Sequence, residues 1–278
     1  MSSNIDRKVT MKKFIYVFVI VGIAIMAAGC KSSQKDENIT DSNIELGDYK
    51  NLKVTVEKGT VTEESVKSYM ERLVESYSSE EKISFEELTD EYVATYMKDT
   101  GYTSILELED GVREYLNSTN DYYAANNTRT AISEELTKVC KVKELPEGLL
   151  NERVESYIQS FRNTCEKQYG MTYEAYLSTL QITEETFRER SKDTVKKSLE
   201  QELILLEIAK QEEIDADENG YQEYIQKLMN SYGYEAEKDL YDAYSEESLK
   251  NAYICNKVLD KLAESTEVTF VAVGALND

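Results

Sequence analysis

A single proline, Pro146, in 278 residues leaves this chain free to form long uninterrupted helices. Proline breaks helices because it lacks an amide hydrogen and clashes with the preceding turn. Apolar residues also recur at helical spacing along most of the chain, as in Val66, Tyr69, Met70 and Leu73. The sequence therefore predicts an all-α fold. The apolar stripes are narrow and many charges lie between them, which indicates helical hairpins that stand partly free.

The expected helices are separated by glycines and capping residues. Leu52, Val54 and Val56 alternate with polar residues, so 46–61 is expected to be extended, and 268–273 is a candidate terminal strand. The stretch 117–130 is polar and is where a kink would fall. Helices are predicted over 62–77, 85–98, 105–139, 145–170, 172–179, 183–212, 221–233 and 246–264.

The composition excludes several classes of function. The chain has no histidine, which removes imidazole-dependent catalysis and histidine metal sites. There are 54 acidic and 32 basic residues, and the net charge of −22 argues against a nucleic-acid partner. No glycine-rich phosphate loop occurs, and the paired acids fit first helical turns better than catalysis. No catalytic residue, metal or cofactor is predicted.

The N-terminus has the pattern of a lipoprotein signal peptide. Met11-Lys12-Lys13 precedes an apolar run over 14–28, which is shorter than the ~20 residues of a spanning helix. Ala27-Ala28-Gly29-Cys30 resembles the bacterial lipobox, which implies cleavage before Cys30 and lipid attachment to it. The alternative is a short anchor helix with an incidental cysteine. We expect a signal peptide over 1–30, a flexible tether over 31–45, and an extracytoplasmic protein lipid-anchored to the outer face of a bacterial cell membrane.

Three further cysteines, Cys140, Cys165 and Cys255, are widely spaced and fall within predicted helices. Their odd number and spacing match neither a disulfide framework nor a metal motif. We expect small buried apolar side chains. One disulfide with one free thiol is the alternative.

Tyrosine is strongly over-represented, with 21 tyrosines against 6 phenylalanines and no tryptophan. Tyrosine offers apolar contact area with a tip that tolerates water, and methionine adds adaptable contacts, so both suit surfaces with varied partners. At stripe positions the simpler interpretation is packing between helices. The candidate client-binding residues are Tyr157, Phe161, Tyr169, Met171, Tyr173, Tyr176, Tyr224, Met229 and Tyr232.

Eight segments, in order, resemble the trigger factor family from about residue 46 to 270. They are Leu46–Val54 with Val61–Val66, Phe85–Tyr92 with Ile105–Arg113, Leu145–Arg153, Tyr169–Leu177, Ile182–Phe187 and Glu207–Ile214. The resemblance implies a helical body over 46–144 and two helical arms over 145–278. It also implies a chaperone that binds unfolded polypeptides between 145–213 and 214–262. Together with the lipobox pattern and the tyrosine content, this favours a membrane-anchored, ATP-independent chaperone for unfolded or newly exported polypeptides.

The sequence departs from the family at two places. Only seven residues separate Tyr77 from Phe85, where the family carries a prolyl-isomerase domain, and a domain needs ~50 residues or more. The ribosome-docking head has no counterpart before Leu46. We therefore expect neither ribosome binding nor isomerase activity to carry over. Two alternatives stay open: a peptidyl-prolyl isomerase by family inheritance, and a lipoprotein that docks one dedicated partner.

Overall fold

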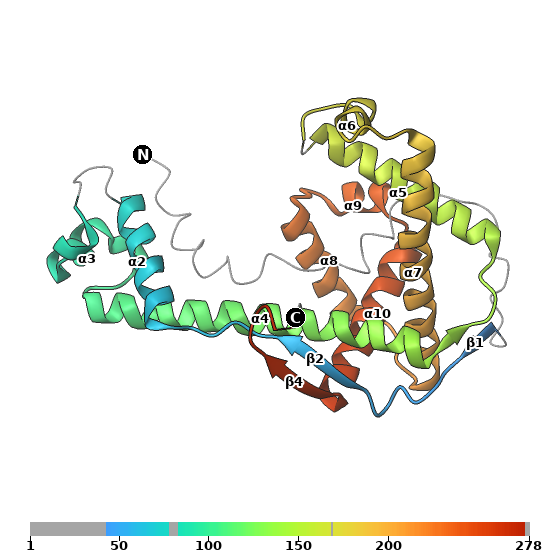
Figure 1. Cartoon of the computed structure of the whole chain (residues 1–278), viewed down its shortest axis with the longest axis horizontal. Helices are drawn as coiled ribbons and strands as arrows, with labels where there is room; N and C mark the ends of the chain where they lie inside the picture. Colours follow the sequence, from blue (N-terminus) through green and yellow to red (C-terminus); the bar gives the residue numbers. More distant parts are fainter. Residues whose placement is uncertain (1–42, 78–82, 168, 276–278) are drawn as a thin grey trace. The chain divides into compact units, whose positions relative to one another are not determined.

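The computed structural model describes residues 43–77, 83–167 and 169–275, and they form two compact units. Of the described residues, one unit contains those within 55–127 and 269–275, and the other contains those within 43–54 and 128–268. The predicted signal peptide, its lipobox and Cys30 lie outside the described residues. Among the described helices, none combines the length and the apolar character needed to cross a membrane. The chain is predominantly helical, as predicted (Figure 1).

The first unit is built on α2 (Glu63–Tyr77) and the first part of α4 (Ile105–Val139). Thr62 caps α2 as expected, because its hydroxyl accepts a hydrogen bond of 3.1 Å from the amide of Ser65. The apolar stripe of α2 is buried, together with the short helices that precede α4. The core contains Val66, Met70, Val74, Leu88, Tyr92, Val93, Met97, Leu108 and Val112.

The single helix predicted over 85–98 is wrong. The structure has two 3-10 turns, η4 (Phe85–Glu87) and η5 (Lys98–Thr100), on either side of α3 (Asp90–Tyr96). Thr89 interrupts the helix because its extended backbone lets its hydroxyl accept a hydrogen bond from the amide of Tyr92. A cap inside an apolar run therefore outweighed the run's helical periodicity.

Helix α4 has the predicted bounds and remains helical through its polar middle. Ala124 and Thr128, within that middle, are both buried. Tertiary packing therefore stabilises the polar stretch where the sequence predicts a possible kink, and the helix continues through it without a break.

Two small sheets join distant parts of the sequence. Strand β2 (Lys53–Glu57) pairs with β4 (Glu267–Val271), which confirms both predicted extended segments in shorter form. Strands β1 (Ile44–Glu45) and β3 (Lys141–Val142) pair antiparallel, with Ile44 opposite Val142. This second sheet was not predicted, because two-residue strands leave no alternation in the sequence.

The second unit is arranged around α7 (Glu184–Gln211), which packs against α5 (Glu147–Lys167) and α10 (Glu246–Ser265). Helix α6 (Tyr173–Thr179) contacts both α5 and α7 and lies across their end (Figure 1). Helix α8 (Glu218–Tyr232) contacts α10, and the unpredicted α9 (Glu237–Ala243) contacts α8.

All three described cysteines are free and buried. Cys165 lies in α5, Cys255 in α10, and Cys140 directly after α4. Burial raises the pKa of each thiol, as expected of small core side chains. The alternative with one disulfide is not observed among the described cysteines.

Candidate functional site

The end of the second unit formed by the last turns of α5, helix α6 and the first turns of α7 is called the tip. Local capping shapes it. Gly170 turns the chain with a positive φ of 62°. Thr172 and Thr183 then cap α6 and α7, since their hydroxyls accept hydrogen bonds from the amides of Ala175 and Thr186. Each of these turns was visible in the sequence.

An aromatic cluster fills the inside of the tip. The ring of Phe161 lies 4.9 Å from that of Phe187 and 5.2 Å from that of Tyr176, measured between centroids. Tyr169 stacks on Tyr176 at 5.6 Å, with the rings only 12° from parallel. Tyr173 is buried beneath them. Aromatic pairs in such geometries add stabilisation beyond the area they bury.

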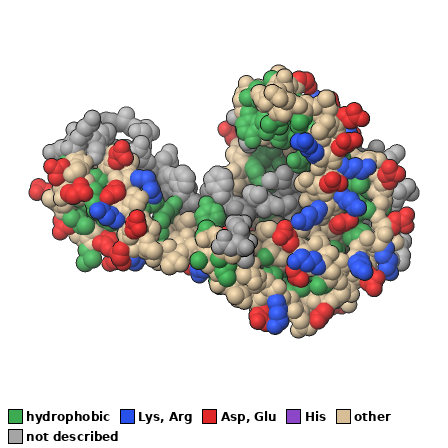
Figure 2. Space-filling view, viewed as in Figure 1, with side chains coloured by type: hydrophobic (Ala, Val, Ile, Leu, Met, Phe, Trp, Pro, Cys, Tyr) green, Lys and Arg blue, Asp and Glu red, His purple; other side chains and the backbone are tan. Residues whose placement is uncertain are grey.

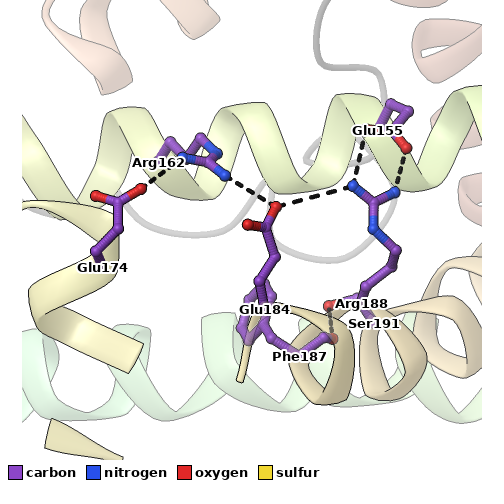
Figure 3. Close-up of polar contacts among 7 residues, drawn as sticks. All are labelled: Glu155, Arg162, Glu174, Glu184, Phe187, Arg188 and Ser191. Carbon is purple, nitrogen blue, oxygen red and sulfur yellow. Dashed lines mark hydrogen bonds and ion pairs between the residues drawn. The ribbon is translucent and has the colours of Figure 1, made fainter. Parts of the chain in front are cut away.

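Two arginines tie the three helices together at the tip (Figure 3). Arg162 of α5 bonds Glu174 of α6 and Glu184 of α7, each at 2.9 Å. Arg188 of α7 bonds Glu155 of α5 and lies 4.0 Å from Glu184. The forked guanidinium group can bridge two carboxylates at once, which a lysine cannot do with fixed geometry. The network therefore fixes how α6 sits on α5 and α7.

The electrostatics of the tip agree with this geometry. The hydrogen bond from Arg188 lowers the pKa of the Glu155 carboxyl. Burial raises the pKa of Tyr173, whose ring also has the Arg162 guanidinium 4.1 Å from its centroid. The Glu155 carboxyl is thus favoured in its ionised form and the Tyr173 hydroxyl in its neutral form.

The outer face of the tip is apolar and open to solvent. Tyr169 is 50% exposed, Leu180 50% and Met171 36%. Figure 2 shows hydrophobic side chains gathered over α6. Exposed large apolar side chains are one of the features found on surfaces that bind other molecules.

The structure separates the predicted client-binding residues into two groups. Five of them belong to the aromatic cluster, and Met171 is 36% exposed on the outer face. The five are Tyr157, Phe161, Tyr169, Tyr173 and Tyr176.

The remaining three, Tyr224, Met229 and Tyr232, belong to α8. Tyr224 and Met229 are buried in a separate core with α9 and α10, whereas Tyr232 is 45% exposed. Tyr173, Tyr224 and Met229 are packed in the core and stabilise the fold. Substituting them would therefore lower stability as well as any binding at the surface.

Sequence reasoning missed Leu180, because it stands outside any helical stripe. It is the C-cap of α6, and the next residue, Gln181, has a positive φ of 56°. This closing turn leaves the leucine side chain 50% exposed. Only the tyrosine and methionine content of the segment pointed to this surface.

Comparison with known proteins places the chain in a family. The sequence profile of the bacterial trigger factor protein C-terminus matches residues 104–264. The trigger factor of Caldicellulosiruptor saccharolyticus is 30% identical over 186 residues, 66% of this chain and 41% of that protein. The trigger factor of Clostridioides difficile is 27% identical over 62% of this chain and 41% of its own length.

The chain thus spans about two fifths of the length of these curated relatives. A solved structure from work on promiscuous substrate recognition in folding and assembly by the trigger factor chaperone aligns with a TM-score of 0.45 and 15% identity. That alignment covers 80% of this chain and 72% of the solved one. On the profile match, which covers more than half of its residues, the chain belongs to the bacterial trigger factor C-terminal family.

Proposed function

We propose that this protein is an ATP-independent chaperone that holds unfolded or newly exported polypeptides. We further propose that lipid on Cys30 anchors it at the outer face of a bacterial membrane. Family membership supports the first part, and the lipobox pattern of Ala27-Ala28-Gly29-Cys30 supports the second.

The observation that carries the proposal is the exposed apolar surface of Tyr169, Met171 and Leu180. These side chains sit on a tip that is rigidly held by the Phe161 cluster and by Arg162 and Arg188. Methionine and tyrosine adapt to varied partners, and a few exposed side chains give weak contacts that release without nucleotide. Such a surface suits many unfolded clients better than one fixed ligand.

The charge of the chain limits which clients it would hold. A net charge of −22 keeps a loaded complex soluble and repels acidic polypeptides at low salt. Clients with basic or neutral apolar segments are therefore favoured.

The test is suppression of aggregation of a chemically unfolded protein, followed by light scattering with the full chain at a stoichiometric ratio. The tip variant Y169S/M171S/L180S should lose most of the suppression. A matched control, Y96S/L106S/Y123S, changes three exposed apolar residues of the first unit and should retain it. Both variants should keep their helical circular dichroism.

Two results would contradict the proposal. Equal suppression by the tip variant and the wild type would remove the tip from client binding. Absence of suppression with several unrelated clients would favour a lipoprotein that docks a single partner.

The anchor is tested separately. In a bacterial host the wild type should incorporate labelled fatty acid and fractionate with membranes, and Cys30→Ser should do neither. Membrane retention of Cys30→Ser at the wild-type level would instead support an N-terminal anchor helix.

A further inference from the structure

A pocket of about 440 Å³ lies at the other end of α7, in the second unit. It is formed by the last turn of α7, the turn after it, the end of α10 and the segment before β2. Its lining includes the apolar side chains of Ile208, Ile214, Val258 and Leu262, the buried Tyr49, and a charged rim of Lys50, Glu212 and Lys261, of which the two lysines are exposed. Pockets of this size hold ligands in many proteins.

The charged groups at the rim satisfy one another. The Glu212 carboxylate accepts hydrogen bonds from the Tyr49 hydroxyl at 2.7 Å and from Lys261 at 2.9 Å, and it pairs with Lys50 at 2.7 Å. These bonds, led by Lys50, lower the pKa of Glu212 to about 2. Glu264 also lines the pocket, so two carboxylates balance two ammonium groups. The rim therefore offers no net charge to a ligand's head group.

The floor of the pocket is apolar. Ile208, Val258 and Leu262 are buried, and Ile214 is half-buried. Ile214 reaches its place because Glu213 has a positive φ of 55°, which closes α7 and brings the amide of Ile214 to the carbonyl of Ala209 at 2.8 Å. A ligand would therefore gain binding free energy mainly by burying apolar surface against this floor.

We propose that the pocket binds one bulky, uncharged apolar side chain, such as leucine, methionine or phenylalanine, from the same polypeptide that contacts the tip. The inference rests on the proposed chaperone function and adds a second attachment point to it. A continuous helix fixes the spacing, because Phe187 at the tip and Ile208 at the pocket both belong to α7. Their separation along the axis is about 32 Å at ~1.5 Å per residue.

The spacing predicts which polypeptides gain from both sites. An extended chain rises ~3.3 Å per residue, so about ten residues are needed to span the distance. Two apolar anchors closer than that can use only one site at a time. Anchors farther apart can use both, and the second contact then forms within one complex at high effective concentration.

The experiment uses labelled peptides with two leucine–phenylalanine anchors separated by 4, 12 or 20 glycine and serine residues. Binding to the full chain is measured by fluorescence anisotropy. We expect the peptides with the two longer spacers to bind at least tenfold more tightly than the one with the shortest. Ser265→Trp places an indole at the rim of the pocket and should abolish this gain. The matched control Gln222→Trp, on the exposed surface of α8, should retain it.

The outcomes separate the inference from the proposed function. Affinity that is independent of spacing, or a gain that persists in Ser265→Trp, overturns the pocket while leaving binding at the tip intact. If no peptide binds the wild type at any spacing, the proposed function itself fails.

Discussion

At its first turns α7 meets α5 and α6 through the guanidinium groups of Arg162 and Arg188, whereas at its last turn it meets Tyr49 and α10 through Lys50 and Lys261. At the tip, Arg162 and Arg188 each lie within ion-pair distance of two carboxylates. The apolar side chains of the outer face there are exposed to solvent. At the last turn of α7, by contrast, the single carboxylate of Glu212 forms ion pairs with both Lys50 and Lys261. Both lysines line the same pocket as the buried Ile208, Val258 and Leu262.

The difference shows how one long helix can carry two kinds of apolar surface. At the tip, Leu180 and Met171 are exposed, and the core beneath the tip is filled by aromatic rings. At the pocket, Ile208 and Leu262 line a hollow that those rings do not fill. Ion pairs hold both ends in place, and the exposed pairs contribute orientation more than stability.

The largest expected contrast comes from two leucines, one at each end. Leu262→Ala removes a buried side chain from the pocket floor and should lower the free energy of unfolding by about 2–5 kcal/mol. Leu180→Ala removes an exposed side chain and should change it by about 0.5 kcal/mol or less. Urea unfolding followed by circular dichroism measures both. Equal losses would mean that Leu180 is packed as deeply as Leu262.

A smaller contrast comes from two buried tyrosines. The Tyr49 hydroxyl donates to Glu212, so Tyr49→Phe should cost about 1–2 kcal/mol. The Tyr173 hydroxyl is buried and makes no hydrogen bond within the described part of the chain, so Tyr173→Phe should be neutral or stabilising. The same unfolding assay applies. A loss in Tyr173→Phe as large as that in Tyr49→Phe would reveal a partner for its hydroxyl.

The smallest expected effect is the pH dependence of Glu212. Its pKa is lowered from 4.5 to about 2, so the folded state favours the ionised carboxyl. This stabilisation is fully present above pH 4.5 and is lost as the pH falls toward 2. The stability difference between wild type and Glu212→Gln should shrink across that range. The exposed neighbour variant Glu213→Gln is the control. A difference that stays constant on acidification would show that Lys50 and Lys261 do not act on Glu212.

Much of the helical structure follows from local signals. Thr62, Thr172 and Thr183 mark helix starts, and Gly170 and Gly233 mark ends, because caps and left-handed turns depend on a few neighbouring residues. The two errors in the predicted helices, at 85–98 and at α9, also have local causes. Thr89 acted as a cap inside a run with helical periodicity, and α9 is too short to show a stripe.

The candidate site was predictable only in part. Tyrosine and methionine content pointed to the correct segments, and the sequence order identified the family. The sequence alone did not distinguish Tyr224 from Tyr232, which both belong to α8. Tyr224 is buried, whereas Tyr232 is 45% exposed. Leu180 carried no signal, because its exposure depends on the turn at Gln181.

Local periodicity and capping were therefore enough to establish that the chain is helical, where most helices begin and end, and which segments are rich in binding-type side chains. Which of those side chains face water was settled by how α5, α6, α7 and α10 pack together. Exposure is a property of the whole packed unit, since the same tyrosine is core or surface depending on what lies over it. The pocket between α7, α10 and Tyr49 has the same origin, because its walls come from residues about 160 positions apart in the chain.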